Sequence, residues 1–217
     1  MKKRLPANAK QRADLARKKL AEVYPDSVCS LNFKNSFELL VSTILAAQCT
    51  DARVNTVTPT LFNNWPTPYE LALAALEELE QVVFSTGFYR AKAKNLILMA
   101  QRLVEVYDGE VPSEIEDLAS LAGVGRKTAN VIRAECLGLP GLPVDTHVTR
   151  LSRRLKLTNN TDAVLIETDL CRLLPEEEWG LFSIRLIDHG RAICDARKPL
   201  CHECELQDFC PSFEKFT

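Results

Sequence analysis

Four cysteines near the carboxyl end of the chain have the spacing of metal ligands. They are Cys194, Cys201, Cys204 and Cys210, in the pattern C-x6-C-x2-C-x5-C. Four thiolates so close in sequence can surround a zinc ion or a [4Fe-4S] cluster. Structural zinc more often uses two close Cys pairs with a long spacer between them, and only Cys201 and Cys204 form such a pair. The spacing alone favours a cluster weakly and leaves zinc open.

A glycine-rich stretch, LAGVGRKTANV at residues 121–131, is the second segment that could do chemistry. It does not match a nucleotide-binding P-loop, because Arg126 precedes Lys127 and a serine occupies the place of the first glycine. We expect a tight turn between two helices in which Gly123 and Gly125 allow positive φ and leave the backbone uncovered. The second helix would present unpaired N–H groups and the positive end of its dipole, a site for one DNA phosphate. The alternative is an ordinary turn.

The distribution of charge is more informative than its sum. The chain has 217 residues, 46% hydrophobic and 26% charged, with a net charge of -2, the composition of an ordinary globular protein. Residues 1–20 carry eight Lys or Arg against one Asp, and acidic residues gather at 77–80, 108–117 and 176–178. Further basic groups predict a positive face for a polyanion, with solvated helix faces as the alternative: Arg90, Lys92, Lys94, Arg126, Lys127, Arg133, Arg150, Arg153 and Arg154.

Neither a membrane segment nor a disulfide framework is predicted. No apolar run approaches the ~18 residues needed to cross a bilayer, and no hydrophobic segment follows the basic amino terminus. We therefore expect a cytoplasmic monomer that does not bind membranes. The chain has eight cysteines, and without a secretion signal the four outside the terminal group are expected to be small core residues: Cys29, Cys49, Cys136 and Cys171.

Helical periodicity predicts the elements that position these residues. Apolar residues from 37 to 45 recur at helical spacing, and Asn35 with Glu38 supplies an amino-terminal cap. The same period predicts helices over 69–84 and 91–107, with a turn between them.

Later segments extend the helical pattern. Ser113 and Glu116 form a capping box ahead of a short helix, and a longer helix is predicted over 126–137. The GLPGLP segment at 138–143 ends that helix and is the best candidate for a domain junction. No alternating run predicts a strand, so the fold class is all-α.

LAGVGRKTANV followed by VDTH at 144–147 resembles the endonuclease III family of DNA glycosylases, and the likeness runs from FELLVSTILAAQCTD at 37–51 to the terminal cysteines. The resemblance implies a two-domain helix-hairpin-helix glycosylase fold. A six-helix barrel domain would span 29–139, a helical iron-sulfur domain would combine 1–28 with 140–217, and a cleft would lie between them. It implies a bifunctional glycosylase and abasic-site lyase of base excision repair, acting on oxidised pyrimidines in double-stranded DNA. The four terminal cysteines would hold a [4Fe-4S] cluster.

The resemblance also assigns a catalytic pair. Lys127 would be the nucleophile and Asp145 its partner, which stabilises positive charge on the sugar, accepts a proton, or does both. A helix amino end and Arg126 oppose further positive charge, and this favours the neutral, nucleophilic amine. From the residues alone, the lysine could be a phosphate contact and the aspartate a helix cap. The hairpin segment that would bind the DNA backbone comprises Gly123, Val124 and Gly125.

Other DNA contacts follow from the resemblance. Extruding a base costs a few kcal/mol and leaves a gap, which Gln48 and Phe88 would fill. Read without the family, Gln48 is a polar residue ending a helix and Phe88 is core. Asp51 would line the damaged-base pocket or cap the next helix. Between two cluster ligands, Arg197 and Lys198 would offer cations to DNA phosphates.

Two departures from the family pattern bear on rival functions. Ala122 stands where the hairpin commonly has proline, and Ala46 where relatives often have serine, which leaves the lesion preference open. A monofunctional mismatch glycosylase of the same fold is one alternative, but such enzymes lack the lysine nucleophile. A non-catalytic DNA-binding module with a structural metal is the other.

Overall fold

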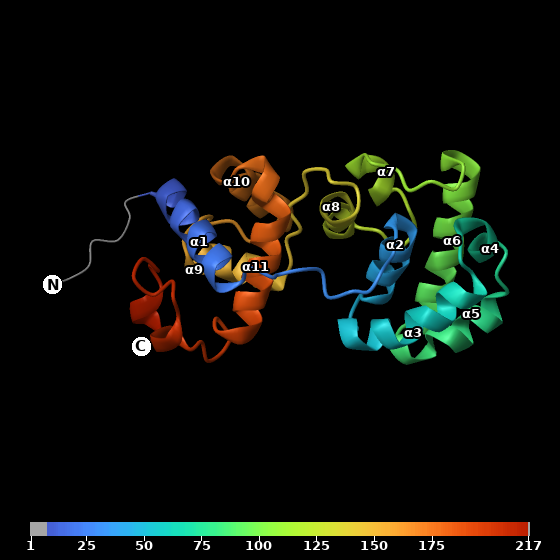
Figure 1. Ribbon diagram of the computed structural model, residues 1–217, viewed down its shortest axis with the longest axis horizontal. Coiled ribbons are helices and arrows are strands. Elements are labelled where there is room, and N and C mark those ends of the chain that lie inside the picture. Colours follow the sequence, from blue (N-terminus) through green and yellow to red (C-terminus); the bar gives the residue numbers. More distant parts are fainter. Residues whose placement is uncertain (1–7, 217) are drawn as a thin grey trace. The chain divides into compact units, whose positions relative to one another are not determined.

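The computed structural model describes residues 8–216, and helices and turns account for all of its regular structure (Figure 1). No strand occurs among those residues, which confirms the all-α prediction. The chain divides into two compact units. We call Cys29–Gly141 the central unit, and Met1–Val28 together with Leu142–Thr217 the terminal unit. None of the helices described is long and apolar enough to span a membrane.

The central unit is built on α6, a 19-residue helix whose buried stripe includes Leu96, Met99 and Leu103. Helices α4 and α5 pack on α6, and α2 packs on α3, α6 and α8 (Figure 1). Together these faces enclose one hydrophobic core. The elements are α2 (Ser36–Leu45), α3 (Asp51–Asn64), α4 (Pro68–Ala72), α5 (Leu76–Val83), η1 (Phe84–Thr86), α6 (Tyr89–Tyr107), α7 (Ile115–Ala119) and α8 (Arg126–Glu135).

Helix α2 begins where the sequence predicts. Asn35 accepts a hydrogen bond from the backbone N–H of Glu38 at 2.9 Å. Glu38 in turn accepts from the N–H of Lys34 at 2.7 Å, one residue earlier than in a standard capping box. Nearly the whole helix is buried, so its carboxyl end is fixed against the core. That end leads directly into the turn that carries Gln48.

Three predicted features differ from the structure. The single helix expected over 69–84 is divided into α4 and α5. The cap expected at Ser113 is absent because α7 begins one residue later, with Glu114 at its N-cap and no side-chain cap bond. The helix expected over 126–137 ends at Glu135. Element ends are the least well determined feature of a periodic pattern.

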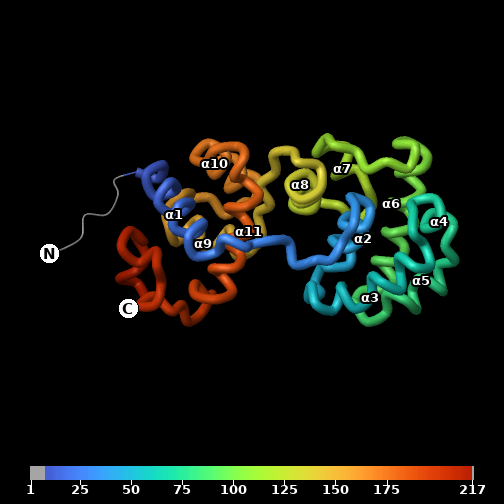
Figure 2. Tube along the Cα trace, viewed as in Figure 1, coloured from blue at the N-terminus to red at the C-terminus, as the bar shows by residue number. Residues whose placement is uncertain are grey.

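The terminal unit joins the two ends of the chain. Helix α1 packs against α10 and α11, although well over a hundred residues separate them in sequence (Figure 2). An ion pair between Arg17 and Glu178 reinforces that contact, and Phe182 and Leu186 lie in the core. The elements are α1 (Ala9–Val23), α9 (Thr146–Arg154), α10 (Ala163–Leu173), η2 (Glu176–Glu178), α11 (Trp179–Ala192), η3 (Cys201–Glu203) and η4 (Phe213–Lys215).

Candidate active site and metal centre

The turn between α7 and α8 depends on one glycine for its backbone shape and on another for open space. Gly123 has φ +80°, and an added Cβ would lie 3.1 Å from Cβ of Asn95 and 3.3 Å from Ile44. Gly125 has φ -105° and ψ 175°, so the expectation of positive φ there is wrong. Its Cβ would meet nothing within 4 Å. Gly125 therefore leaves an uncovered approach to the first turn of α8.

The amino end of α8 retains the features of an anion site. No described side chain caps it, and its N-cap is Gly125. The first backbone N–H groups of a helix have no partner within the helix, and the dipole is positive there. Val124 is 7% exposed and packs in the core, so any contact it makes with a ligand must come from its backbone.

Lys127 is exposed in the first turn of α8. Burial raises the pKa of the Cys29 thiol, Asp51 contributes to the increase, and the Lys127 ammonium opposes it. The candidate nucleophile and the candidate pocket carboxylate thus act on the same thiol. Asp51 is the first residue of α3, whose N-cap is Thr50, so Asp51 is not itself the cap.

Gln48 and Phe88 occupy two exposed turns of the central unit, both at positive φ. Gln48 has φ 54° in the turn between α2 and α3, and Phe88 has φ 47° immediately before α6. Phe88 is 67% exposed, which excludes the alternative that it belongs to the core. Gln48 lies three residues beyond the end of α2, in the turn and not on the helix. Left-handed backbone is costly for residues other than glycine, and it often marks a functional turn.

Asp145 begins α9 in the terminal unit. Its Oδ1 accepts a hydrogen bond from the N–H of Val148 at 2.8 Å, so the cap that the residues alone suggested is present. That bond uses one carboxylate oxygen. The half-buried carboxylate therefore caps the helix and can still interact with a ligand through Oδ2.

An open cavity of about 880 Å³ lies beside Asp145 in the same unit. Its walls are strongly cationic, with a single carboxylate among the lining residues. Such a wall attracts a polyanion. The cations are Arg150, Arg153, Arg154, Lys156 and Lys215.

The four terminal cysteines line a single small pocket together with Arg154. None of them is in a disulfide. Arg154 donates to Cys194 Sγ at 3.1 Å, and His189 Nε2 lies 3.3 Å from Cys204 Sγ. Burial raises the pKa of Cys204 to about 12, and the other three thiols add to the shift.

This thiol pocket fits a metal cluster. Four partly buried thiols that share one pocket can all be thiolates only around a strongly positive centre. The pocket offers four sulfur donors, a set that fits a four-iron cluster.

Asp195 and Arg154 hold the loop between the first two cysteines in place. Asp195 Oδ1 accepts from the N–H groups of Arg197 at 2.8 Å and Lys198 at 3.0 Å. Arg154 donates to the carbonyls of Asp195 at 2.7 Å and Ala196 at 2.9 Å. The side chains of Arg197 and Lys198 remain exposed. The loop thus presents two cations on a backbone that is already ordered.

Two residues of the expected positive face have different environments. Lys92 is only 5% exposed and contacts backbone carbonyls, so its placement on an exposed basic face is wrong. Arg154 is half-buried among the cluster ligands. A signal for Lys92 was available, because it lies four residues before the buried Leu96 and so falls on the apolar stripe of α6.

Comparison with known proteins identifies the family. Residues 41–176 match the family model described as HhH-GPD superfamily base excision DNA repair protein. Endonuclease III of Synechocystis sp. is 52% identical over 95% of this chain and 94% of its own length. The chain belongs to the endonuclease III family. Residues 194–210 match a second model, the iron-sulfur binding domain of endonuclease III.

Solved structures of endonuclease III agree with this fold. A non-covalent endonuclease III-DNA complex has a TM-score of 0.90 and 42% identity, covering 95% of this chain and 97% of the other. A trapped endonuclease III-DNA covalent intermediate has a TM-score of 0.89 and 43% identity, with the same coverage. The predicted two-domain helix-hairpin-helix glycosylase fold is confirmed.

Membership of the endonuclease III family confirms the predicted class of enzyme and cofactor. The chain is a DNA glycosylase and abasic-site lyase of base excision repair. Its carboxyl-terminal segment is an iron-sulfur domain, and the cofactor is a [4Fe-4S] cluster.

Proposed function

We propose that the chain removes oxidised pyrimidines from double-stranded DNA through an imine formed by Lys127, and then cleaves the strand 3′ to the abasic site. The observation that carries this proposal is the place of Lys127. Its amine is exposed in the first turn of α8, directly after a hairpin turn that leaves the helix end open. A phosphate held at that helix end would bring the sugar of the same strand near the amine.

Lys127 can serve as the single protein nucleophile for both base release and strand cleavage. The neutral amine of Lys127 attacks C1′, the bond between C1′ and the base breaks, and the base leaves with a proton. The sugar ring opens to an imine. Loss of a proton from C2′ then forms a double bond as the C3′–O bond breaks, which releases the 3′ phosphate. Water hydrolyses the imine and restores the lysine.

Asp145 supports the charge changes on the sugar. Positive charge develops at C1′ as the base departs, and a carboxylate stabilises that charge most in a site shielded from water. Asp145 is half-buried and oriented by its bond to Val148, so it needs little reorganisation. Asp51 would line the pocket for the extruded base, since it begins α3 directly after the turn that carries Gln48.

DNA binding would involve three further groups of residues. Gln48 and Phe88 would fill the gap left by the extruded base, since both are exposed in turns. The backbone of the hairpin segment, Gly123, Val124 and Gly125, would hold one phosphate. Arg197 and Lys198 would bind phosphates from the cluster loop.

The cluster is proposed to be structural. Cys194, Cys201, Cys204 and Cys210 would hold it, which fixes the loop that presents Arg197. When bound, the cluster supplies the positive centre that keeps the four thiolates together. All proposed contacts come from a single chain, so we infer that the enzyme acts as a monomer. We also infer that it acts in the cytoplasm.

Borohydride trapping on a duplex with an abasic site tests the nucleophile. Reduction converts an imine into a stable bond between protein and DNA, so the native protein should be trapped and Lys127→Ala should not. Lys34→Ala is the matched control, because Lys34 is an exposed lysine of the same unit outside the proposed site. It should be trapped as well as the native protein.

Three outcomes would contradict the proposal. Undiminished trapping of Lys127→Ala would exclude Lys127 as the nucleophile. Base release by the native protein without any adduct would indicate a monofunctional glycosylase. Binding without either reaction would indicate a non-catalytic module. A panel of thymine glycol, other oxidised pyrimidines and uracil measures the substrate class, and preferred release of uracil would overturn that assignment.

A further inference from the structure

Lys92 is a buried lysine whose hydrogen bonds join two separate turns. It lies in the first turn of α6 and is 5% exposed. Its Nζ donates to the carbonyl of Leu45 at 2.8 Å and to the carbonyl of Thr86 at 2.7 Å. Both acceptors are the last residues of their helices, α2 and η1. Terminal carbonyls have no partner within a helix, and they carry the negative end of the dipole.

Each acceptor lies two or three residues before one of the two proposed DNA-inserting residues. Gln48 follows Leu45 by three residues, and Phe88 follows Thr86 by two. The backbone N–H of Lys92 also donates to the carbonyl of Phe88 at 3.1 Å. Lys92 thus contacts the residue that precedes the turn of Gln48, the residue that precedes the turn of Phe88, and Phe88 itself.

Burial of this ammonium is unfavourable and calls for an explanation. Burial lowers the pKa of Lys92, and no carboxylate bonds to it among the residues described. An apolar side chain would avoid this desolvation but would leave both carbonyls unsatisfied. Neighbouring positions of the same stripe, Ala93 and Leu96, are apolar. What a lysine adds at position 92 is therefore the link between the two carbonyls.

We propose that Lys92 is a positioning residue that holds the turns carrying Gln48 and Phe88 at a fixed separation, so that both side chains enter the duplex together. The inference rests on the inserting roles proposed above. Insertion succeeds when the two groups are already spaced to fit the gap, because ordering them during base extrusion adds to a step that already costs a few kcal/mol. Without the link, both side chains remain but their spacing is no longer set.

Stopped-flow fluorescence of 2-aminopurine placed next to the lesion tests this inference, because it reports unstacking directly. Lys92→Met keeps most of the apolar stem of the side chain and removes its donors. We expect it to slow lesion-dependent unstacking by about 10- to 100-fold, while strand cleavage at a preformed abasic site changes by less than about threefold. Lys92→Arg, which keeps two donors and the charge, should restore most of the unstacking rate.

Non-additivity distinguishes positioning from a general loss of structure. If Lys92 acts through the inserting residues, adding Lys92→Met to Gln48→Ala/Phe88→Ala should slow unstacking little further. Absorption of the iron-sulfur cluster and a far-UV thermal melt show whether the protein remains folded. Should Lys92→Met melt below the assay temperature, Lys92→Gln serves in its place, because it is too short to join both carbonyls.

The possible failures are distinguishable. If Gln48→Ala and Phe88→Ala leave unstacking unchanged, the inserting roles themselves are wrong, and the inference about Lys92 falls with them. If those variants slow unstacking and Lys92→Met does not, only the role of Lys92 is wrong. Equal losses in unstacking and in abasic-site cleavage, or full additivity with the double variant, would also overturn it.

Discussion

Alanine substitutions at Gly123 and Gly125 should have opposite effects on stability. Gly123→Ala should destabilise the fold, whereas Gly125→Ala should stabilise it slightly and weaken DNA binding. At Gly123, φ of +80° costs an L-residue about 1 to 2 kcal/mol. The added Cβ would also lie 3.1 Å from Cβ of Asn95, an atom fixed to the backbone of α6. Overpacking of this kind costs about 1 to 3 kcal/mol, so Gly123→Ala should destabilise the protein by roughly 2 to 5 kcal/mol in all.

Gly125→Ala should leave the fold intact and weaken DNA binding. The extended backbone at Gly125 accepts any residue, and an added Cβ meets nothing within 4 Å. Lower entropy of the unfolded chain should stabilise this variant by about 0.4 to 1 kcal/mol. If a phosphate approaches the backbone here, the new methyl group disrupts a charge-assisted hydrogen bond of about 1.5 to 3 kcal/mol, which raises Kd by about 10- to 100-fold.

Urea unfolding followed by far-UV circular dichroism measures the first effect, and titration of a duplex containing a stable abasic analogue measures the second. In the stability measurement each variant is the control for the other, because both place one methyl group in the same turn. A loss of stability in Gly125→Ala equal to that in Gly123→Ala would refute the backbone argument. Unchanged DNA affinity in Gly125→Ala would refute the phosphate site at the end of α8.

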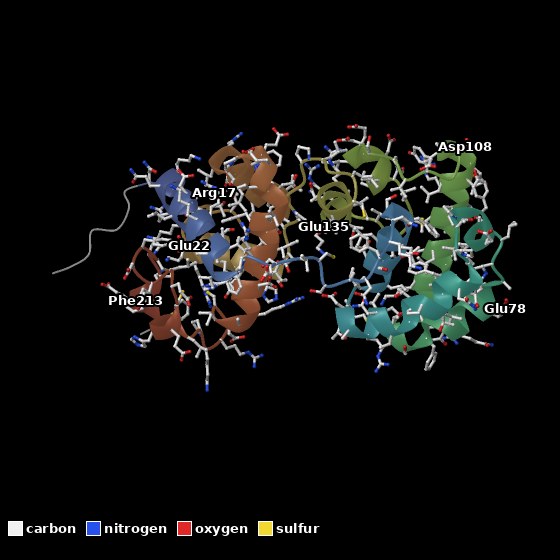
Figure 3. All side chains as sticks on the ribbon, in the orientation of Figure 1. Arg17, Glu22, Glu78, Asp108, Glu135 and Phe213 are labelled. Carbon is white, nitrogen blue, oxygen red and sulfur yellow. The ribbon has the colours of Figure 1, made fainter. Side chains whose placement is uncertain are left out.

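Three further predictions concern separate residues. Asp145→Asn should keep the cap of α9, since asparagine caps as well as aspartate, and should change the unfolding free energy by less than about 0.5 kcal/mol. Single-turnover base release should fall at least about 100-fold. Equal losses of stability and of base release would contradict this prediction. Removing Arg197 or Lys198 by alanine should each lower the slope of log Kd against log salt by about 0.9, measured by DNA titration, and an unchanged slope would exclude a phosphate contact. Burial raises the pKa of Glu135, which Figure 3 labels, so the stability that Glu135 contributes at low pH is lost as the pH rises through that pKa. Glu135→Gln should therefore raise the melting temperature at pH ~8 and not at pH ~4. An effect on the melting temperature that does not depend on pH would contradict the raised pKa.

Local signals in the sequence were sufficient where the chain determines its own conformation. The cap at Asn35 was predicted correctly because its side chain reaches a backbone donor three residues away. The division of 69–84 into α4 and α5 has no glycine or proline to mark it. Leu71 and Leu79 are eight residues apart and both fully buried, so they fit the apolar stripe of one continuous helix as well as two shorter ones. Periodicity therefore does not report the break.

The candidate site shows the same distinction. Gly123 and Gly125 are alike in the sequence, but only Gly123 requires positive φ, because Asn95 and Ile44 confine that part of the turn. The GxG pattern identified the hairpin without showing which glycine shapes it. Gly125 instead leaves open space, because no atom lies within 4 Å of the position that its Cβ would occupy.

Two lysines show why residue type alone does not determine a role. Lys127 and Lys92 both lie in the first turn of a helix, and the charge pattern of the sequence predicts the same positive face for both. Lys127 is exposed beside an open helix end, where its amine can reach a ligand. Lys92 is enclosed by two terminal carbonyls, which hold its ammonium in place and leave it no access to DNA. Attack at a sugar needs a lone pair that is free to move toward C1′, whereas positioning needs a donor that does not move. The environment of each lysine satisfies one of these conditions and excludes the other.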